Sequence, residues 1–84
     1  MEVIENVYIL EQYDEMCKRI RELRDDEFCI VVRTNPNVEL DNIIRDSIFS
    51  LLEIAEKYHV ETTLFENTQT ETYSVTFKKK ENRT

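Results

Sequence analysis

The chain has 84 residues and a formal net charge of −7, with 18 acidic side chains against 11 basic ones. This length suffices for one domain with one small core, and a hydrophobic content of 40% exceeds that of disordered chains. The chain contains no glycine, which excludes a P-loop and the glycine fingerprint of dinucleotide-binding folds.

The N-terminal part of the chain predicts a strand, a helix and a second strand. Residues 5–10, ENVYIL, form a short apolar run that is typical of a strand covered on at least one side. A single apolar stripe at helical spacing predicts the helix, and it comprises Tyr13, Met16, Cys17, Ile20 and Leu23. Residues 28–33, FCIVVR, are apolar on both faces, which indicates a central strand or one covered by a partner.

A turn and a long helix follow. Residues 34–37, TNPN, favour a turn, and Thr34, Asn35 or Asn37 is expected to cap the next helix. That helix spans about residues 39–59. Its main apolar stripe comprises Leu40, Ile43, Ile44, Leu51, Ile54, Ala55 and Tyr58, with Ile48 on its flank.

The C-terminal part predicts a hairpin. Two alternating runs, VETTLFEN and TETYSVTFKK, are joined by a polar turn at residues 67–69. Because glycine is absent, Asn, Asp or longer loops must supply the positive-φ positions of turns and helix ends. The candidate positions are Asp25, Asp26, Asn35, Asn37 and Asn67.

The element order β-α-β-α-β-β predicts the fold class. Right-handed crossovers place both helices on one face of a sheet whose first two strands are parallel. The terminal hairpin adds antiparallel strands, so we expect a two-layer α/β sandwich with a mixed four-stranded sheet. We assign residues 1–80 to this single domain and residues 81–84 to a disordered C-terminal tail.

Apolar side chains outside the expected core predict a partner surface. The central strand carries Cys29 and Val31 on its second face, and Phe49 and Leu52 lie outside the main stripe of the long helix. We expect Val31, Phe49 and Leu52 to form an interface with a protein partner. The alternative is that Phe49 lies beneath a loop or the tail.

The strand EFCIVVRT, the Asn-rich turn, the long helix LDNIIRDSIFSLLEIAEKY and the hairpin closing on TYSVTFKKK resemble the Alba family of small nucleic-acid-binding proteins. The same order is similar to the C-terminal domain of bacterial translation initiation factor three. The resemblance covers roughly residues 5–80 and concerns the order and lengths of the elements. It implies a dimer whose hairpins and loops bind DNA or RNA.

The chain departs from the Alba pattern at two loops. Alba proteins carry a pair of lysines after the first strand, where this chain has Glu11 and Gln12. Their glycine-and-arginine turn after the second strand is replaced by Asn-Pro-Asn, although Arg33 lies just before it. The resemblance therefore implies a nucleic-acid-binding subunit that has lost the central lysine contact.

Positive charge is concentrated at the C-terminal end of this acidic chain. Residues 1–69 have a net charge of −9, whereas residues 70–84 have a net charge of +2. Since Lys and Arg supply most nonspecific affinity for nucleic acid, the candidate nucleic-acid-binding residues are Arg33, Lys78, Lys79, Lys80 and Arg83. For the lysine run, the alternative is a solvated C-terminal tail.

Catalytic and metal-binding patterns are missing from the sequence. Cys17 and Cys29 lack CxxC spacing and are expected to be buried free thiols, with a disulfide or a metal site as the alternative. His59, the one histidine, falls at a helix end, where its charge favours the helix dipole. We expect no enzyme, no cofactor and no metal.

Two hypotheses on function follow. The first is a small Alba-like protein that binds nucleic acid, RNA in preference to DNA, as a subunit of a homodimer, a heterodimer or a ribonucleoprotein. The second is an acidic protein-interaction module or inhibitor that occupies a basic nucleic-acid-binding surface. An acidic N-terminal stretch and the lack of a long apolar run predict a soluble intracellular protein, cytoplasmic or nuclear, without membrane contact.

Overall fold

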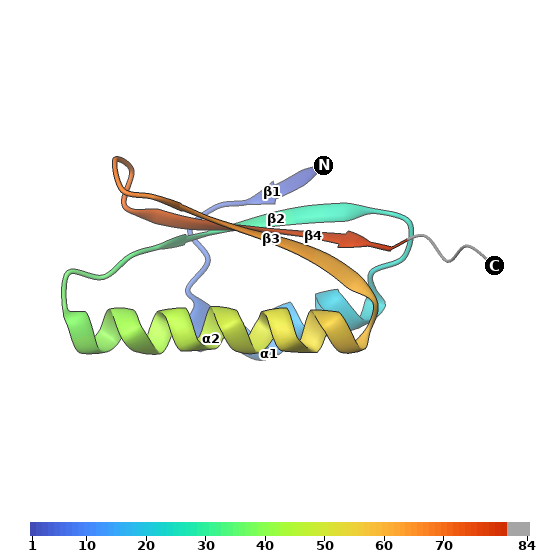
Figure 1. Cartoon of the computed structure of the whole chain (residues 1–84), viewed down its shortest axis with the longest axis horizontal. Helices are drawn as coiled ribbons and strands as arrows, with labels where there is room; N and C mark the ends of the chain where they lie inside the picture. The colour runs from blue at the N-terminus through green and yellow to red at the C-terminus, as the bar shows by residue number, and fades with distance from the viewer. Residues whose placement is uncertain (81–84) are drawn as a thin grey trace.

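The computed structural model describes residues 1–80, in which a four-stranded sheet lies over two helices (Figure 1). The elements are β1 (Glu2–Ile4), α1 (Ile9–Glu22), β2 (Glu27–Arg33), α2 (Val38–Lys57), β3 (Val60–Asn67) and β4 (Thr72–Lys79). The strand order is β1-β2-β4-β3, with β1 parallel to β2 and the other neighbours antiparallel. The predicted two-layer α/β sandwich is confirmed. The tail expected at residues 81–84 lies outside the described residues.

The first strand lies earlier in the chain than residues 5–10, so that prediction is wrong. β1 spans Glu2–Ile4, and α1 already begins at Ile9. Val7 is buried in the connection, where its N–H donates to the carbonyl of Val31, and Ile9 is buried on the inner side of α1. Val7 and Ile9 are therefore apolar because they lie in a buried connection and in the first turn of a helix. Two buried residues separated by one position fit a strand equally well, so the pattern over residues 5–10 does not distinguish the two structures.

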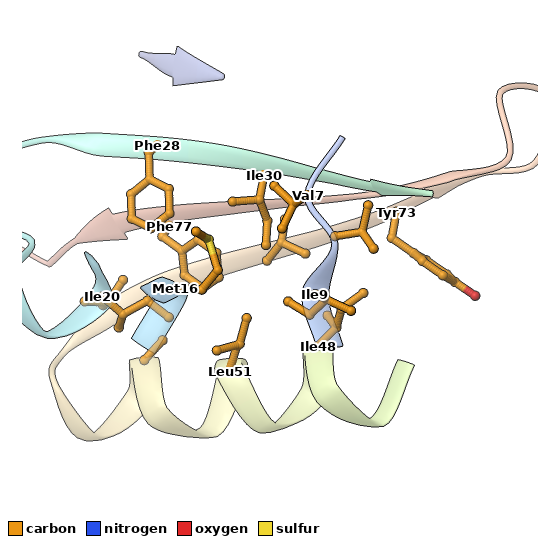
Figure 2. Close-up of a cluster of buried hydrophobic side chains, with 14 residues drawn as sticks. Val7, Ile9, Met16, Ile20, Phe28, Ile30, Ile48, Leu51, Tyr73 and Phe77 are labelled. Atoms are coloured by element: carbon orange, nitrogen blue, oxygen red, sulfur yellow. The ribbon is translucent and has the colours of Figure 1, made fainter. Parts of the chain in front are cut away.

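The core lies between the sheet and the two helices (Figure 2). From the sheet, the directly paired residues Phe28 and Phe77 stack their rings with centroids 5.0 Å apart. Further along the same two strands, Ile30, Val32, Tyr73 and Val75 are buried; the helices contribute Ile9, Met16, Ile20, Ile48, Leu51 and Ala55. Since alternate residues of β2 and β4 enter this core, their remaining side chains lie on the open face of the sheet.

The buried side of α2 is rotated relative to the stripe expected from the sequence. Ile48, expected on the flank, is 1% exposed, whereas Leu40 and Ile43 are 44% and 48% exposed. Leu52, expected outside the stripe, is partly buried against the core. The N-terminal turns of α2 extend beyond α1 in Figure 1, so the apolar residues of these turns have no helix beside them.

The turn between β2 and α2 is held by side-chain caps. Asn37 is the N-cap of α2, as one of the sequence alternatives predicted, and its side chain accepts a hydrogen bond from the N–H of Leu40 at 3.1 Å. Asn35 accepts from the N–H of Asn37, while its own N–H donates to Asp41 at 2.9 Å. These bonds replace the glycines that commonly shape such turns.

Positive-φ backbone occurs at Asn6, His59 and Glu71, with φ between 56° and 59°. None of these residues is among the positions expected from the sequence, so that expectation is wrong. His59 directly follows Tyr58, the C-cap of α2, and takes the left-handed conformation that glycine commonly supplies there. Asn67 contributes differently, because its side chain accepts hydrogen bonds from the N–H groups of the hairpin turn.

Candidate interaction surfaces

The lysine run lies at one end of the sheet, close to carboxylates. Lys78 stands between its register partners Glu27 on β2 and Glu61 on β3. The N–H of Lys80 donates to the carbonyl of His59 at 3.0 Å. The three lysines and Arg24 line a shallow hollow of about 250 Å³ together with Asp25, Asp26 and Glu27. Positive charge at this end is therefore largely compensated by neighbouring carboxylates.

Arg33 lies at the other end of the sheet. It pairs with Thr72, six residues from Lys78 along β4, which corresponds to about 20 Å of strand. The structure thus brings Lys78, Lys79 and Lys80 together but does not bring Arg33 to them, because β2 and β4 are antiparallel. Arg33 instead lines a hollow of about 320 Å³ beside the start of α1. Arg83 lies outside the described residues.

The three predicted interface residues are divided between two surfaces. Val31 alternates with the core residues Ile30 and Val32, so its half-buried side chain lies on the open face of the sheet. Phe49 and Leu52 lie on α2, and both line a hollow against β3. Phe49 is 46% exposed, so it is not covered within the described part of the chain.

Phe49 and Leu52 belong to a second stripe on α2, which we call the outer flank: Phe49, Leu52, Glu53 and Glu56. These positions follow the spacing i, i+3, i+4 and i+7, so they share one side of the helix. The outer flank and the first residues of β3 enclose a hollow of about 770 Å³. Its charged lining consists of Glu53, Glu56 and Glu61 with Lys80, so the hollow is net acidic.

β3 is the long edge strand of the sheet. In an antiparallel pair, opposite residues alternate between those that exchange hydrogen bonds and those that do not. The N–H of Lys80 donates to the carbonyl of His59, so these two residues form a hydrogen-bonded pair, and every second pair along β3 and β4 does the same. By that alternation, the N–H and C=O groups of Thr62, Leu64 and Glu66 point away from β4. We call these outward groups the β3 edge. Two apolar side chains accompany it on opposite faces, Leu64 at 38% and Phe65 at 60% exposure.

The sequence pattern found only part of this surface. The displacement of Phe49 from the main apolar stripe signalled the outer flank, and an apolar residue on a polar helix side is a usable signal. Leu64 and Phe65 were not selected, because the sequence does not show which strand of a predicted sheet lies at its edge. The order of strands is set by long-range pairing.

The side chains considered for chemistry have structural explanations. Both cysteines are free; Cys29 is buried and Cys17 half-buried, and burial raises the pKa of the Cys17 thiol, opposite to what an activated thiolate requires. The hydroxyl of Tyr73 donates to Asp41 at 2.8 Å, and burial followed by this hydrogen bond raises the pKa of Tyr73 to about 12. This bond ties α2 to β4.

Residues 1–80 contain no group of three or more His, Cys, Asp or Glu side chains that is placed to hold a metal ion. Neither α1 nor α2 combines the length and the apolar composition that crossing a membrane requires.

Comparison with family models, curated proteins and solved structures found no match to this chain. The resemblance to the Alba family therefore stays a prediction.

Proposed function

We propose that this chain is a non-enzymatic protein-interaction module that binds its partner along the β3 edge and the outer flank of α2. The observation that carries the proposal is the coincidence of an edge strand whose outer side pairs with no other strand of residues 1–80 with exposed apolar side chains on the helix beside it. An edge strand that keeps its backbone groups free is a template for pairing with another chain. The exposed Phe49 and Leu64 supply apolar area that association removes from water.

The low net charge at the end of the sheet that carries Lys78, Lys79 and Lys80 favours protein interaction over nucleic-acid binding as the function. A polyanion is repelled by a chain of net charge −7 unless basic residues gather on one face. Here Lys78 is flanked by Glu27 and Glu61, and Arg33 is at the opposite end of the sheet. A protein partner requires no such concentration of positive charge.

Site-directed photo-crosslinking tests the proposal. A photoreactive residue replaces Phe49 or Phe65. Tyr8, an aromatic residue on another surface that at 68% is more exposed than either phenylalanine, serves as the control. In cells that naturally express the chain, we expect both phenylalanine positions to yield an adduct with the same protein and Tyr8 to yield none. Adducts of equal strength from all three positions, or none from the two phenylalanine positions, would contradict the proposal.

A charge substitution in the outer flank provides a second, independent test of the proposed interaction surface. Phe49→Glu places a carboxylate in the apolar part of the outer flank, so crosslinking from position 65 should be lost while helicity is unchanged. Mass spectrometry of the adduct identifies the partner, and light scattering shows whether it is a second copy. For a homodimer, the apparent mass should fall from that of a dimer to that of a monomer in the Phe49→Glu variant.

Nucleic-acid binding is the second candidate function. The observation in its favour is that Lys78 and Lys80 are exposed at one end of the sheet, within residues 70–84, which have a net charge of +2. In this proposal the chain is one subunit of a dimer, and a basic partner supplies the charge that it lacks. A titration with structured RNA at low and physiological salt, with and without the captured partner, tests it. Lack of salt-dependent binding in every combination would refute it.

A further inference from the structure

We propose that the partner presents an extended segment containing Lys or Arg, which adds to β3 as a fifth strand of the sheet. This inference rests on the proposed function and names the occupant of the same surface. It follows from three properties of the surface: the direction of its backbone groups, the place of its apolar side chains and the sign of its charge.

The backbone of β3 requires an extended occupant. Thr62, Leu64 and Glu66 direct their N–H and C=O groups outward at a spacing of two residues. An added strand meets these groups with its own alternate N–H and C=O groups, and such main-chain bonds supply affinity in strand addition. A helix cannot do so, because its backbone groups are already paired within the helix.

The apolar side chains mark the two faces of the added strand. On the helix side, Phe49 and Leu52 line the 770 Å³ hollow, so alternate side chains of the occupant enter it. On the open face, the exposed Phe65 lies beside the edge. It contacts the remaining side chains of the occupant, which alternate with those that enter the hollow. Apolar or β-branched residues therefore suit the positions that face Phe65.

The charge of the hollow selects a basic segment. Glu53, Glu56 and Glu61 line it against Lys80, so its charged groups sum to a negative value. Opposite charge on the occupant steers the encounter and discriminates against acidic competitors. Lys and Arg also have apolar stems, which cover Phe49 or Leu52 while the charged group reaches a carboxylate.

A second copy of this chain does not match that charge. Residues 58–77, which include all of β3 and the hairpin turn, contain neither Lys nor Arg. Pairing β3 with a second β3 therefore adds Glu61 and Glu66 to a surface that is already acidic. Each copy also has a net charge of −7, so self-association concentrates like charge.

The first experiment selects occupants without assuming their identity. A displayed library of random peptides about ten residues long, enough to span the eight residues of β3, is selected on the chain. Glu53→Lys/Glu56→Lys serves as the counter-selected variant. We expect peptides in which Lys or Arg alternates with apolar or β-branched residues. Failure to select any peptide, or enrichment of acidic or helix-patterned peptides, would overturn the inference.

The second experiment measures the contribution of the carboxylates. For a selected peptide, we expect Glu53→Lys/Glu56→Lys to weaken binding about tenfold or more, because two attractive contacts become repulsive. The control is Glu15→Lys/Glu22→Lys, which makes the same change in net charge at exposed positions of α1. We expect it to weaken binding less than about threefold. Equal losses in the two variants would show that only overall charge matters and would refute the site.

The third experiment leaves the protein unchanged, so it does not depend on whether a variant folds. The selected peptide is N-methylated at alternate backbone positions, in two versions that differ by one residue. Strand addition needs the N–H groups of one register only, so one version should lose binding and the other retain it. Equal binding by both versions would exclude pairing with the β3 edge.

These outcomes separate the inference from the proposed function. If crosslinking from Phe49 and Phe65 captures a partner whose contacting segment lacks Lys and Arg, or is a second copy, the inference is wrong and the interaction surface stands. If crosslinking is equal from Phe49 and Tyr8, the proposed function itself fails. Capture of a protein whose crosslinked segment is extended and basic supports both.

Discussion

The two edge strands of the sheet, β1 and β3, differ in the features that prevent their free backbone groups from pairing with another chain. β1 has three residues, and its Glu2 pairs with Arg19 of α1 in an exposed ion pair. β3 has eight residues, and Leu64 and Phe65 beside it are exposed. Short length and charge are two means by which proteins prevent edge-to-edge association. β1 shows both, whereas β3 has only Glu61 and Glu66, so the β3 side of the molecule is the better suited to a partner.

The largest effect is expected between the two edges, in the core beneath β4, which pairs with β2 and β3. Phe77 on β4 pairs with Phe28 of β2 on one side and with Thr62 of β3 on the other. We expect Phe77→Ala to lower the free energy of unfolding by about 3–5 kcal/mol, through lost burial and the cavity left behind. Denaturant unfolding followed by circular dichroism measures this.

The matched control for that prediction is Thr76→Ala, on the open face of the same strand. Its effect should be below about 1 kcal/mol, because its side chain does not enter the core. If Phe77→Ala lowered the free energy of unfolding by no more than Thr76→Ala does, Phe77 would not be part of the core between the sheet and the helices.

Amide hydrogen exchange sharpens the description of the β3 edge residue by residue. We expect the outward N–H groups of Thr62, Leu64 and Glu66 to exchange at least about tenfold faster than those of the alternate residues that bond to β4. Heteronuclear NMR resolves each amide. Uniform protection along β3 would contradict the assigned alternation, whereas a bound peptide should slow the outward set selectively.

Alkaline pH tests the hydrogen bond between Tyr73 and Asp41, which ties α2 to β4. The pKa of Tyr73 is raised to about 12 by burial and by its hydrogen bond to Asp41, so the folded state favours the protonated phenol. Its contribution to stability is therefore complete below the unfolded pKa of about 10 and is lost as the pH rises to about 12. We expect denaturant midpoints to fall more steeply over this window for the natural chain than for Tyr73→Phe. Parallel slopes would contradict the assignment.

The smallest effect is expected at the β1 edge. Glu2 and Arg19 are both exposed, and exposed ion pairs contribute little because water and salt screen them. Glu2→Gln should change the free energy of unfolding by less than about 0.5 kcal/mol, measured by the same denaturant experiment. A loss above 1 kcal/mol would contradict the description of this ion pair as exposed and screened.

Local patterns predicted much of the fold because their causes are local. The two-sided apolar strand FCIVVR is β2, Asn37 caps α2, and the alternating runs form the hairpin β3–β4. Each of these depends on side-chain alternation, capping or turn chemistry within a few residues. The strand expected at residues 5–10 failed because Val7 and Ile9 are buried by contacts with distant elements, which their own spacing does not reveal.

The candidate site was predicted in part for the same reason. The outer flank of α2 was indicated by Phe49, since helical spacing places a residue on a side of its own helix. The exposure of Leu64 and Phe65 was not predicted, because it depends on β3 lying outside β4 in the sheet. The separation of Arg33 from Lys78 likewise depends on the antiparallel pairing of β2 with β4.

The order of elements, the two-layer class and the acidic balance of the chain could be predicted from the sequence, because periodicity and composition act over short distances. The tertiary structure was needed to show which side of α2 is buried, which strand lies at the edge and which charges lie together. These properties arise from pairings between residues far apart in the chain. They are also the properties on which the proposed docking of a basic extended segment depends.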